Sequence, residues 1–155
     1  MFGPPALARC LWLAPLLTVA ALAACPPTFA AYSTPTWRGG AARPVLDTPF
    51  KRLFRTAIRI GAVSGDKFGD RQRLAVWGCG TGCQQAALID TRSGWVGLAP
   101  GATLDYEVRP GSRLLIESPL QPGETLADRT NLASPPPTYW VLHAGRFVQV
   151  CRPGR

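Results

Sequence analysis

The sequence predicts an α+β domain in which one N-terminal amphipathic helix packs on a curved antiparallel β-meander of about six or seven short strands. Apolar residues first recur with the period of a helix, and the pattern then changes to short runs of branched and aromatic residues separated by turns. The 16 glycines and 16 prolines among 155 residues also favour short elements and many turns over a helical bundle.

The helix is predicted over residues 49–60. Asp47-Thr48-Pro49 has the composition of a helix start, because Asp or Thr caps the first turn and proline is tolerated there. Gly61 marks the predicted C-terminal end. Apolar residues at i, i+3, i+4, i+7 and i+8 form one face, which comprises Phe50, Leu53, Phe54, Ala57 and Ile58.

Seven runs after Gly61 have the composition of strands. Turn sequences at 90–94, 109–112 and 143–145 couple neighbouring runs closely and indicate hairpins, hence an antiparallel meander. The proline-rich residues 119–138 form one long loop, of a length that is unusual in compact domains unless functional or disordered. The predicted strands are Arg71–Trp77, Ala86–Asp90, Trp95–Leu98, Tyr106–Arg109, Arg113–Glu117, Tyr139–His143 and Arg146–Val150.

The N-terminus has the layout of a bacterial export signal. A single charge, Arg9, precedes an apolar run over residues 11–21, which is shorter than the ~20 residues that a stable membrane-spanning helix needs. Leu22-Ala23-Ala24-Cys25 resembles the lipobox of bacterial lipoproteins, in which Cys25 is lipidated and becomes the mature N-terminus. The alternative is an ordinary secretory cut before Ala24 or Ala31.

These features divide the chain into a signal peptide (1–24), a flexible tether (25–46) and a single α+β domain (47–155). The tether is predicted because residues 26–46 are rich in Pro, Ala, Gly and Thr and lack apolar periodicity. We therefore expect a protein of the cell envelope that faces the periplasm through a lipid anchor at Cys25, or otherwise a periplasmic or secreted protein.

The densest cluster of unusual residues is Trp77-Gly78-Cys79-Gly80 followed by Cys83-Gln84. This motif resembles a family of small exported bacterial proteins without assigned function. The resemblance implies export and a common fold, and it carries no activity over to this chain. The family has an aromatic-Ala-Gly-His stretch before its first strand, whereas Phe68-Gly69-Asp70-Arg71 stands here, so any role of that histidine is absent. Further residues that carry the resemblance are Phe54–Arg59, Asp90–Arg92 with Gly94, and Ser112–Ile116.

Cys79 and Cys83 are predicted to form a structural disulfide, because cysteines this close are usually oxidised outside the cytoplasm and the flanking glycines permit a tight ring. Three alternatives remain open: a metal site with Cys151 and His143, a redox pair, or a cysteine nucleophile with His143 as base. If Cys25 carries lipid, Cys151 is left as the odd thiol. No metal or other cofactor is predicted.

The chain is basic, with a formal net charge of +8. Basic residues of the predicted helix lie opposite its apolar face without acidic i+4 partners inside the helix. Such a face binds an anionic membrane or an acidic partner, or is simply solvated. Nucleic acid is not expected in that compartment. The candidate binding surface comprises Lys51, Arg52, Arg55, Arg59, Trp77 and Gln84.

The function expected from these observations is non-enzymatic. Small, disulfide-stapled exported domains with few acids and bases arranged for catalysis more often recognise than react, so no catalytic residue is predicted. We expect a cell-envelope protein that binds or inhibits a partner, a cell-wall hydrolase being one concrete version by class analogy. The alternative is an envelope enzyme that uses the Cys79/Cys83 loop for thiol–disulfide or hydrolytic chemistry.

Overall fold

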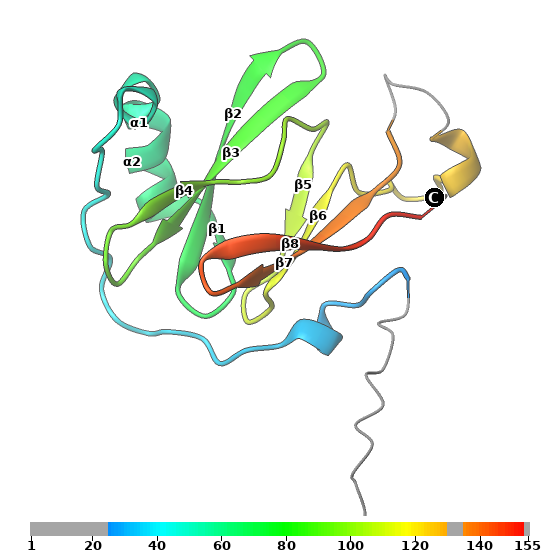
Figure 1. Cartoon of the computed structure of the whole chain (residues 1–155), viewed down its shortest axis with the longest axis horizontal. Coiled ribbons are helices and arrows are strands. Elements are labelled where there is room, and N and C mark those ends of the chain that lie inside the picture. Colours follow the sequence, from blue (N-terminus) through cyan, green and yellow to red (C-terminus); the bar gives the residue numbers. More distant parts are fainter. Residues whose placement is uncertain (1–24, 130–134, 154–155) are drawn as a thin grey trace, which may run out of the picture.

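In the described part of the chain, eight strands form two four-stranded antiparallel sheets, each in sequence order (Figure 1). The computed structural model describes residues 25–129 and 135–153. The first sheet contains β1 (Asp66–Phe68), β2 (Gln72–Gly80), β3 (Cys83–Asp90) and β4 (Val96–Leu98). The second contains β5 (Tyr106–Val108), β6 (Leu114–Glu117), β7 (Thr138–His143) and β8 (Arg146–Cys151).

The prediction of one helix on a single meander is therefore wrong, and the fold is mostly β. The chain leaves the first sheet after β4 and begins a second sheet at β5. The inner faces of both sheets share one core, in which Phe68, Leu74 and Leu88 of the first sheet contact Leu115 and Leu142 of the second. Alternation along the strands indicates which residues point inward, but it does not say how many sheets those residues build.

The outer face of the first sheet is covered by the helical segment. Thr48 caps α1 (Pro49–Leu53), its Oγ1 accepting a hydrogen bond from the Lys51 N–H at 3.2 Å. The helix is interrupted at Phe54 and continues as α2 (Arg55–Ser64). This is the only helix longer than five residues in the described part of the chain. Ile58 and Ala62 of α2 pack on β2 and β3.

Gly61 lies inside α2 and does not end it, contrary to the prediction. A Cβ atom at this position would lie 2.2 Å from the Cβ of Ala75 on β2. Glycine therefore allows the helix to approach the sheet closely.

Residues 33–46, which we call the strap, run along one side of both sheets before α1 begins (Figure 1). We expected a flexible tether here, yet backbone hydrogen bonds attach the strap to the sheets. The N–H groups of Thr34, Ala42 and Val45 donate to Gly111, Thr91 and Gly94 carbonyls at 2.8, 2.6 and 2.8 Å. The preceding residues include a 3-10 turn, η1 (Ala30–Tyr32), and Phe29 and Tyr32 pack on the outer face of the second sheet.

Two disulfides join Cys79 to Cys83 and Cys25 to Cys151. The first pair is the one expected from the sequence. The second differs from the expectation of an odd Cys151 thiol, which assumed that the sulfur of Cys25 carries lipid. It connects positions 126 residues apart and holds the start of the described chain beside the end of β8.

The long loop expected at 119–138 is held by Arg129, whose guanidinium is buried. It donates to the Glu124 carboxylate at 2.6 Å and to the Pro119 carbonyl at 3.0 Å. A second short 3-10 turn, η2 (Leu126–Asp128), lies between these partners. Where described, the loop is therefore held together by a charge-assisted contact between its own residues.

One carboxyl group lies in the inter-sheet core. Glu117 of β6 accepts a hydrogen bond from Trp140 Nε1 at 2.8 Å through Oε2, while its buried Oε1 has no partner among the described residues. Burial raises the pKa of Glu117 to about 7, against opposing effects of the Trp140 hydrogen bond and the Arg152 charge.

The raised pKa makes stability depend on pH. Between the ordinary value of 4.5 and about 7, the folded protein keeps a proton that the unfolded chain releases, so stability falls as pH rises through this window. We expect Glu117→Gln to flatten this slope and to raise stability at pH 8 by about 1–2 kcal/mol, a figure discounted for partial exposure of the carboxyl. Urea unfolding of wild type and variant at pH 5 and pH 8 measures both effects, with Glu107→Gln as the control. An unchanged slope in Glu117→Gln would contradict this assignment.

Candidate functional site: a basic cleft

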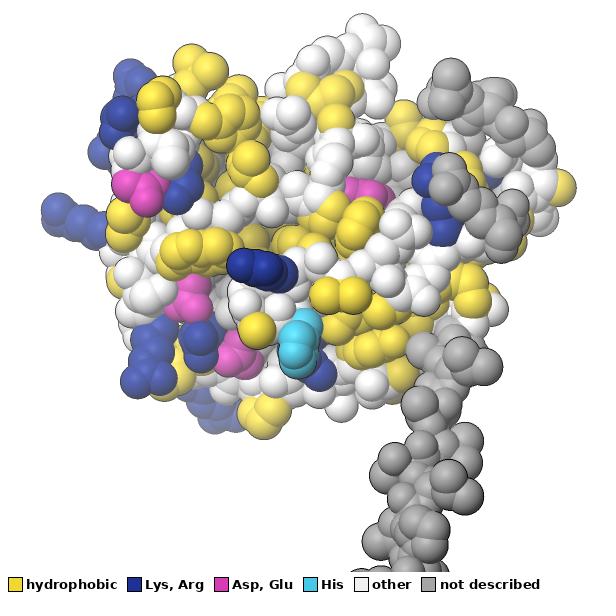
Figure 2. Space-filling model, in the orientation of Figure 1, with side chains coloured by type: hydrophobic (Ala, Val, Ile, Leu, Met, Phe, Trp, Pro, Cys, Tyr) yellow, Lys and Arg dark blue, Asp and Glu magenta, His cyan; other side chains and the backbone are white. Residues whose placement is uncertain are grey.

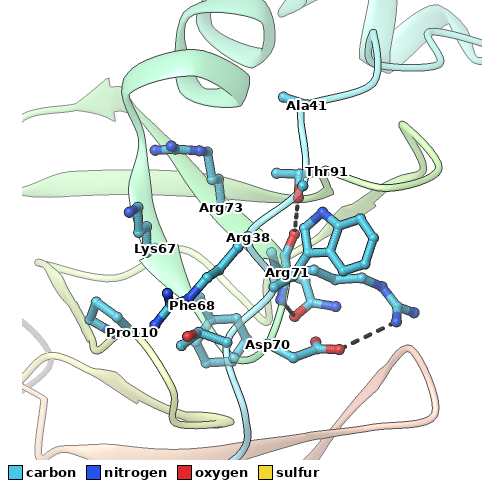
Figure 3. A pocket seen from close by; sticks show the side chains of 14 residues that line it. Arg38, Ala41, Lys67, Phe68, Asp70, Arg71, Arg73, Thr91 and Pro110 are labelled. Atoms are coloured by element: carbon cyan, nitrogen blue, oxygen red, sulfur yellow. Dashed lines mark hydrogen bonds and ion pairs between the residues drawn. The ribbon is translucent and has the colours of Figure 1, made fainter.

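A cleft of about 530 Å³ opens where the strap passes the β1–β2 hairpin (Figure 3). Residues 36–41 of the strap form one wall and residues 67–73 of the hairpin form the other, with Thr91 and Pro110 at the ends. Four cationic side chains and one carboxylate line it: Arg38, Lys67, Arg71, Arg73 and Asp70.

The strand alternation places two of these cations on the same face. Phe68 and Leu74 are fully buried between the sheets, so the adjacent Lys67 and Arg73 point to the other face. Lys67 and Arg73 are direct cross-strand partners in the β1–β2 register. Two like charges directly opposite each other on antiparallel strands destabilise the pair. The register therefore places two like charges opposite each other at a cost to stability, while the Arg73 hydrogen bond to the Gly65 carbonyl ties β2 to the end of α2.

These cations lack ionic partners within the part of the chain that the structure describes. Neither Lys67 nor Arg38 forms an ion pair there, and Arg73 donates only to a neutral acceptor, the Gly65 carbonyl, at 2.8 Å. Figure 3 shows Arg38, Lys67 and Arg73 on the same side of the cleft, contributed by the strap, β1 and β2. The electrostatic potential on this side of the cleft is therefore positive, because none of these three cations forms an ion pair in the described chain.

Arg71, by contrast, is neutralised. Its Nε lies 2.7 Å from Asp90 Oδ2 and its Nη1 lies 3.3 Å from Asp70 Oδ2. Burial disfavours the charge of Asp90, but the Arg71 hydrogen bond and the backbone N–H groups of Ser93 and Arg92 outweigh it and lower the pKa. The Arg71–Asp90 pair therefore holds Arg71 in place in the cleft and fixes the turn after β3.

Trp37 holds the strap at the cleft. Its backbone N–H donates to the Asp70 carbonyl, and the Arg92 guanidinium lies 5.4 Å from the centroid of its ring. A Cβ at Gly39 would lie 2.2 Å from the indole, so the strap backbone packs directly against the ring. We infer from these contacts that the indole positions the strap. Arg38, Lys67 and Arg73 are then the side chains available to bind a ligand.

The structure does not gather the predicted candidate surface into one site. Lys51 pairs with Asp47 at 2.6 Å, and Arg52 donates to the Leu46 and Asp47 carbonyls at 3.3 and 3.1 Å. Arg55 donates to the Arg52 carbonyl at 3.2 Å. Three of the four helical cations are thus engaged near the start of the helical segment, which leaves Arg59 as the exception among the described contacts.

The other two residues of that surface, Trp77 and Gln84, lie on the first sheet. Trp77 on β2 stacks on Phe54 with ring centroids 4.7 Å apart, so its ring packs beneath the helical segment. Gln84 lies at the start of β3, where its backbone exchanges two hydrogen bonds with Thr103. Neither lines the basic cleft.

The structure does not bring Cys79, Cys83, Cys151 and His143 together at one site, as the metal and nucleophile alternatives would require. The disulfide of Cys79 and Cys83 closes the β2–β3 hairpin end, while Cys151 is bonded to Cys25 at the end of the second sheet. His143 lies on the β7–β8 hairpin. Over residues 25–129 and 135–153, no group of three or more His, Cys, Asp or Glu side chains is arranged to hold a metal ion.

Sequence reasoning missed Arg38, Lys67 and Arg73. The signal for the last two was present, because a basic residue flanks a core residue on each side of the Gly69-Asp70 turn. Recognising it required β1, a three-residue strand that was not predicted. Arg38 had no local signal, since its position depends on the strap.

Comparison with protein-family models, with curated proteins and with solved structures found no significant match. Among the described helices, none is both long and apolar enough to cross a membrane.

The like-charge pair predicts a substitution that stabilises the fold. We expect Lys67→Thr to raise the free energy of unfolding by about 0.2–1 kcal/mol, because it removes repulsion from Arg73 and keeps a residue suited to a strand. The same change at Lys51, which has a carboxylate partner, should be neutral or slightly destabilising. Denaturant unfolding at low salt measures both effects, and a lower stability of Lys67→Thr would show that Lys67 supports the fold.

Proposed function

We propose that this protein is a non-enzymatic cell-envelope protein that binds an acidic protein partner in the basic cleft. The observation that carries the proposal is the opposed pair Lys67 and Arg73, joined by Arg38, without ionic compensation in the described chain. An arrangement that costs stability is expected where binding requires it.

The size of the cleft defines what enters it. A volume of about 530 Å³ holds a few side chains, so the partner presents Asp or Glu residues on a protruding loop. Arg38 and Arg73 supply planar guanidinium groups suited to carboxylates, and Lys67 supplies a point charge from the hairpin wall. A cell-wall hydrolase that is inhibited in this way would be bound through such a loop, because two concave surfaces do not fit each other.

Charge reversal in the cleft tests the proposal with a defined probe, a hexaglutamate peptide. Arg38→Glu combined with Lys67→Glu should weaken its binding at least about tenfold by calorimetry, and wild-type affinity should fall as salt rises. Arg146→Glu, at the exposed start of β8, is the matched control and should change affinity by less than about twofold. Equal losses in both variants, or none in the double variant, would contradict binding at the cleft.

Cross-linking in envelope extract then identifies the natural partner. We expect the cross-linked peptide of the partner to be rich in Asp and Glu and to disappear with the double reversal. A partner that is retained by the double variant would bind elsewhere on the protein.

The location of the protein depends on the sulfur of Cys25. One sulfur atom forms either a thioether to lipid or a disulfide, and the bond to Cys151 supports the version in which the exported chain is not lipidated. Independent contacts favour this bond: Ser112 Oγ donates to the Phe29 carbonyl at 2.8 Å and the Arg113 N–H donates to the Tyr32 carbonyl at 2.9 Å. These contacts hold the chain that follows Cys25 against the start of β6, and Phe29 and Tyr32 also pack on the apolar cluster that contains Cys151.

Peptide mapping of the exported protein without reductant tests this version. We expect a cross-link between the Cys25 and Cys151 peptides, and Cys25→Ser should lower stability by about 4 kcal/mol, since the bond closes a loop spanning 126 positions. Wild type and variant should divide in the same way between the membrane and soluble fractions of the envelope, because neither carries lipid at position 25. A lipid-bearing N-terminal Cys25 with a free Cys151 thiol would instead support the lipoprotein form.

A further inference from the structure

The helical segment carries a second apolar surface that faces solvent. Leu53, Ile60 and Val63 are 72, 60 and 74% exposed, although Leu53 was expected on the buried face. On α2, Ile60 and Val63 lie on the side opposite the buried Ile58 and Ala62. We call Leu53, Ile60 and Val63 the apolar ridge. Figure 2 shows hydrophobic side chains next to Lys and Arg over the helical segment at the upper left.

A basic hollow lies beside this ridge. Its volume is about 430 Å³, and its lining combines the strap with α2: Ala41, Ala42, Arg43, Pro44, Arg59, Ala62 and Val63. Arg43 and Arg59 are its only charged lining residues, and neither forms an ion pair within the described chain. Val63 belongs to both surfaces. Arg43 and Arg59 therefore line a hollow that adjoins the apolar ridge at Val63.

We propose that the ridge and the hollow dock the protein on an anionic phospholipid bilayer. The three aliphatic side chains enter the boundary between headgroups and acyl chains, while Arg43 and Arg59 bind the phosphate of one headgroup. The charges favour this occupant, because an anionic bilayer offers phosphates directly next to apolar chains. Small soluble anions would fill the hollow and leave the ridge in water.

This surface is separate from the cleft in which the acidic partner binds. Its apolar ridge and its two cations, Arg43 and Arg59, do not line the cleft, although both sites share the strap residue Ala41. Membrane docking also needs no lipid on Cys25. It provides reversible attachment for a chain whose Cys25 is bonded to Cys151.

Vesicle flotation tests the proposal with the disulfide-bonded chain. Wild type should float with phosphatidylglycerol–phosphatidylcholine vesicles and remain unbound with pure phosphatidylcholine. Ile60→Ser with Val63→Ser should reduce the partition coefficient at least about tenfold, since each lost CH2 group removes apolar burial, and Arg43→Gln with Arg59→Gln should have a similar effect. Leu53→Ser, on α1, is an independent ridge variant and should weaken binding in the same direction.

Matched controls lie on the second sheet. Val148 on β8 is 50% exposed and Arg146 is exposed on the same hairpin, so Val148→Ser and Arg146→Gln should change the partition by less than about twofold. All substituted side chains are exposed, and each variant should keep the melting temperature of wild type. Equal binding to both vesicle types, equal losses in the controls, or binding of inorganic phosphate without vesicle binding would overturn the proposal.

Discussion

The burial of Phe68 between the two sheets is the constraint on which the rest of the structure depends. Its side chain is fully buried, and its ring stacks with Phe147 of β8 at a centroid distance of 5.9 Å. This contact joins the first hairpin of one sheet to the last strand of the other. Because side chains alternate along a strand, it also fixes Lys67 on the outward face, opposite Arg73. A slip of one residue would bury the lysine.

The cleft exists because three parts of the chain meet around this hairpin. The turn after β3 is set by Asp90, which binds Arg71 and accepts two backbone N–H groups. The strap then attaches to that turn through Thr91 and Gly94 and brings Arg38 toward Lys67. The Arg71–Asp90 ion pair thus fixes the position of Arg71 in the cleft, while Arg38, Lys67 and Arg73 remain without ionic partners in the described chain.

Much of the local structure was predictable from the sequence. All seven predicted strands are present within a few residues, since branched and aromatic runs between turns identify strands directly. The helical segment was also found, although Gly61 does not end it, because the close approach to Ala75 is a tertiary contact. The assignment of strands to two sheets was missed, because the break between β4 and β5 and the sharing of one core by both sheets have no local signature.

The site was less predictable than the strands, because it too depends on tertiary contacts that have no local signal in the sequence. Basic residues on the helix were visible as a pattern, but most of them serve local contacts near Asp47. The cleft instead depends on the strap, whose composition is typical of a flexible segment. Its attachment comes from backbone hydrogen bonds, which leave no signal in the sequence, and from the packing of Trp37, which depends on the folded structure. The pairing of Cys25 with Cys151 likewise connects the two ends of the described chain and follows from the fold.

The central claim is that Arg38, Lys67 and Arg73 form one binding site for carboxylates. Side-chain nitrogen resonances report this most directly, because a carboxylate that approaches a guanidinium or ammonium group shifts its signals. In an NMR titration with a glutamate-rich peptide, these three residues should shift together along one saturation curve, while Arg146 at the start of β8 stays unchanged. Shifts of equal size at Arg146, or different saturation curves for the three cations, would contradict a single site.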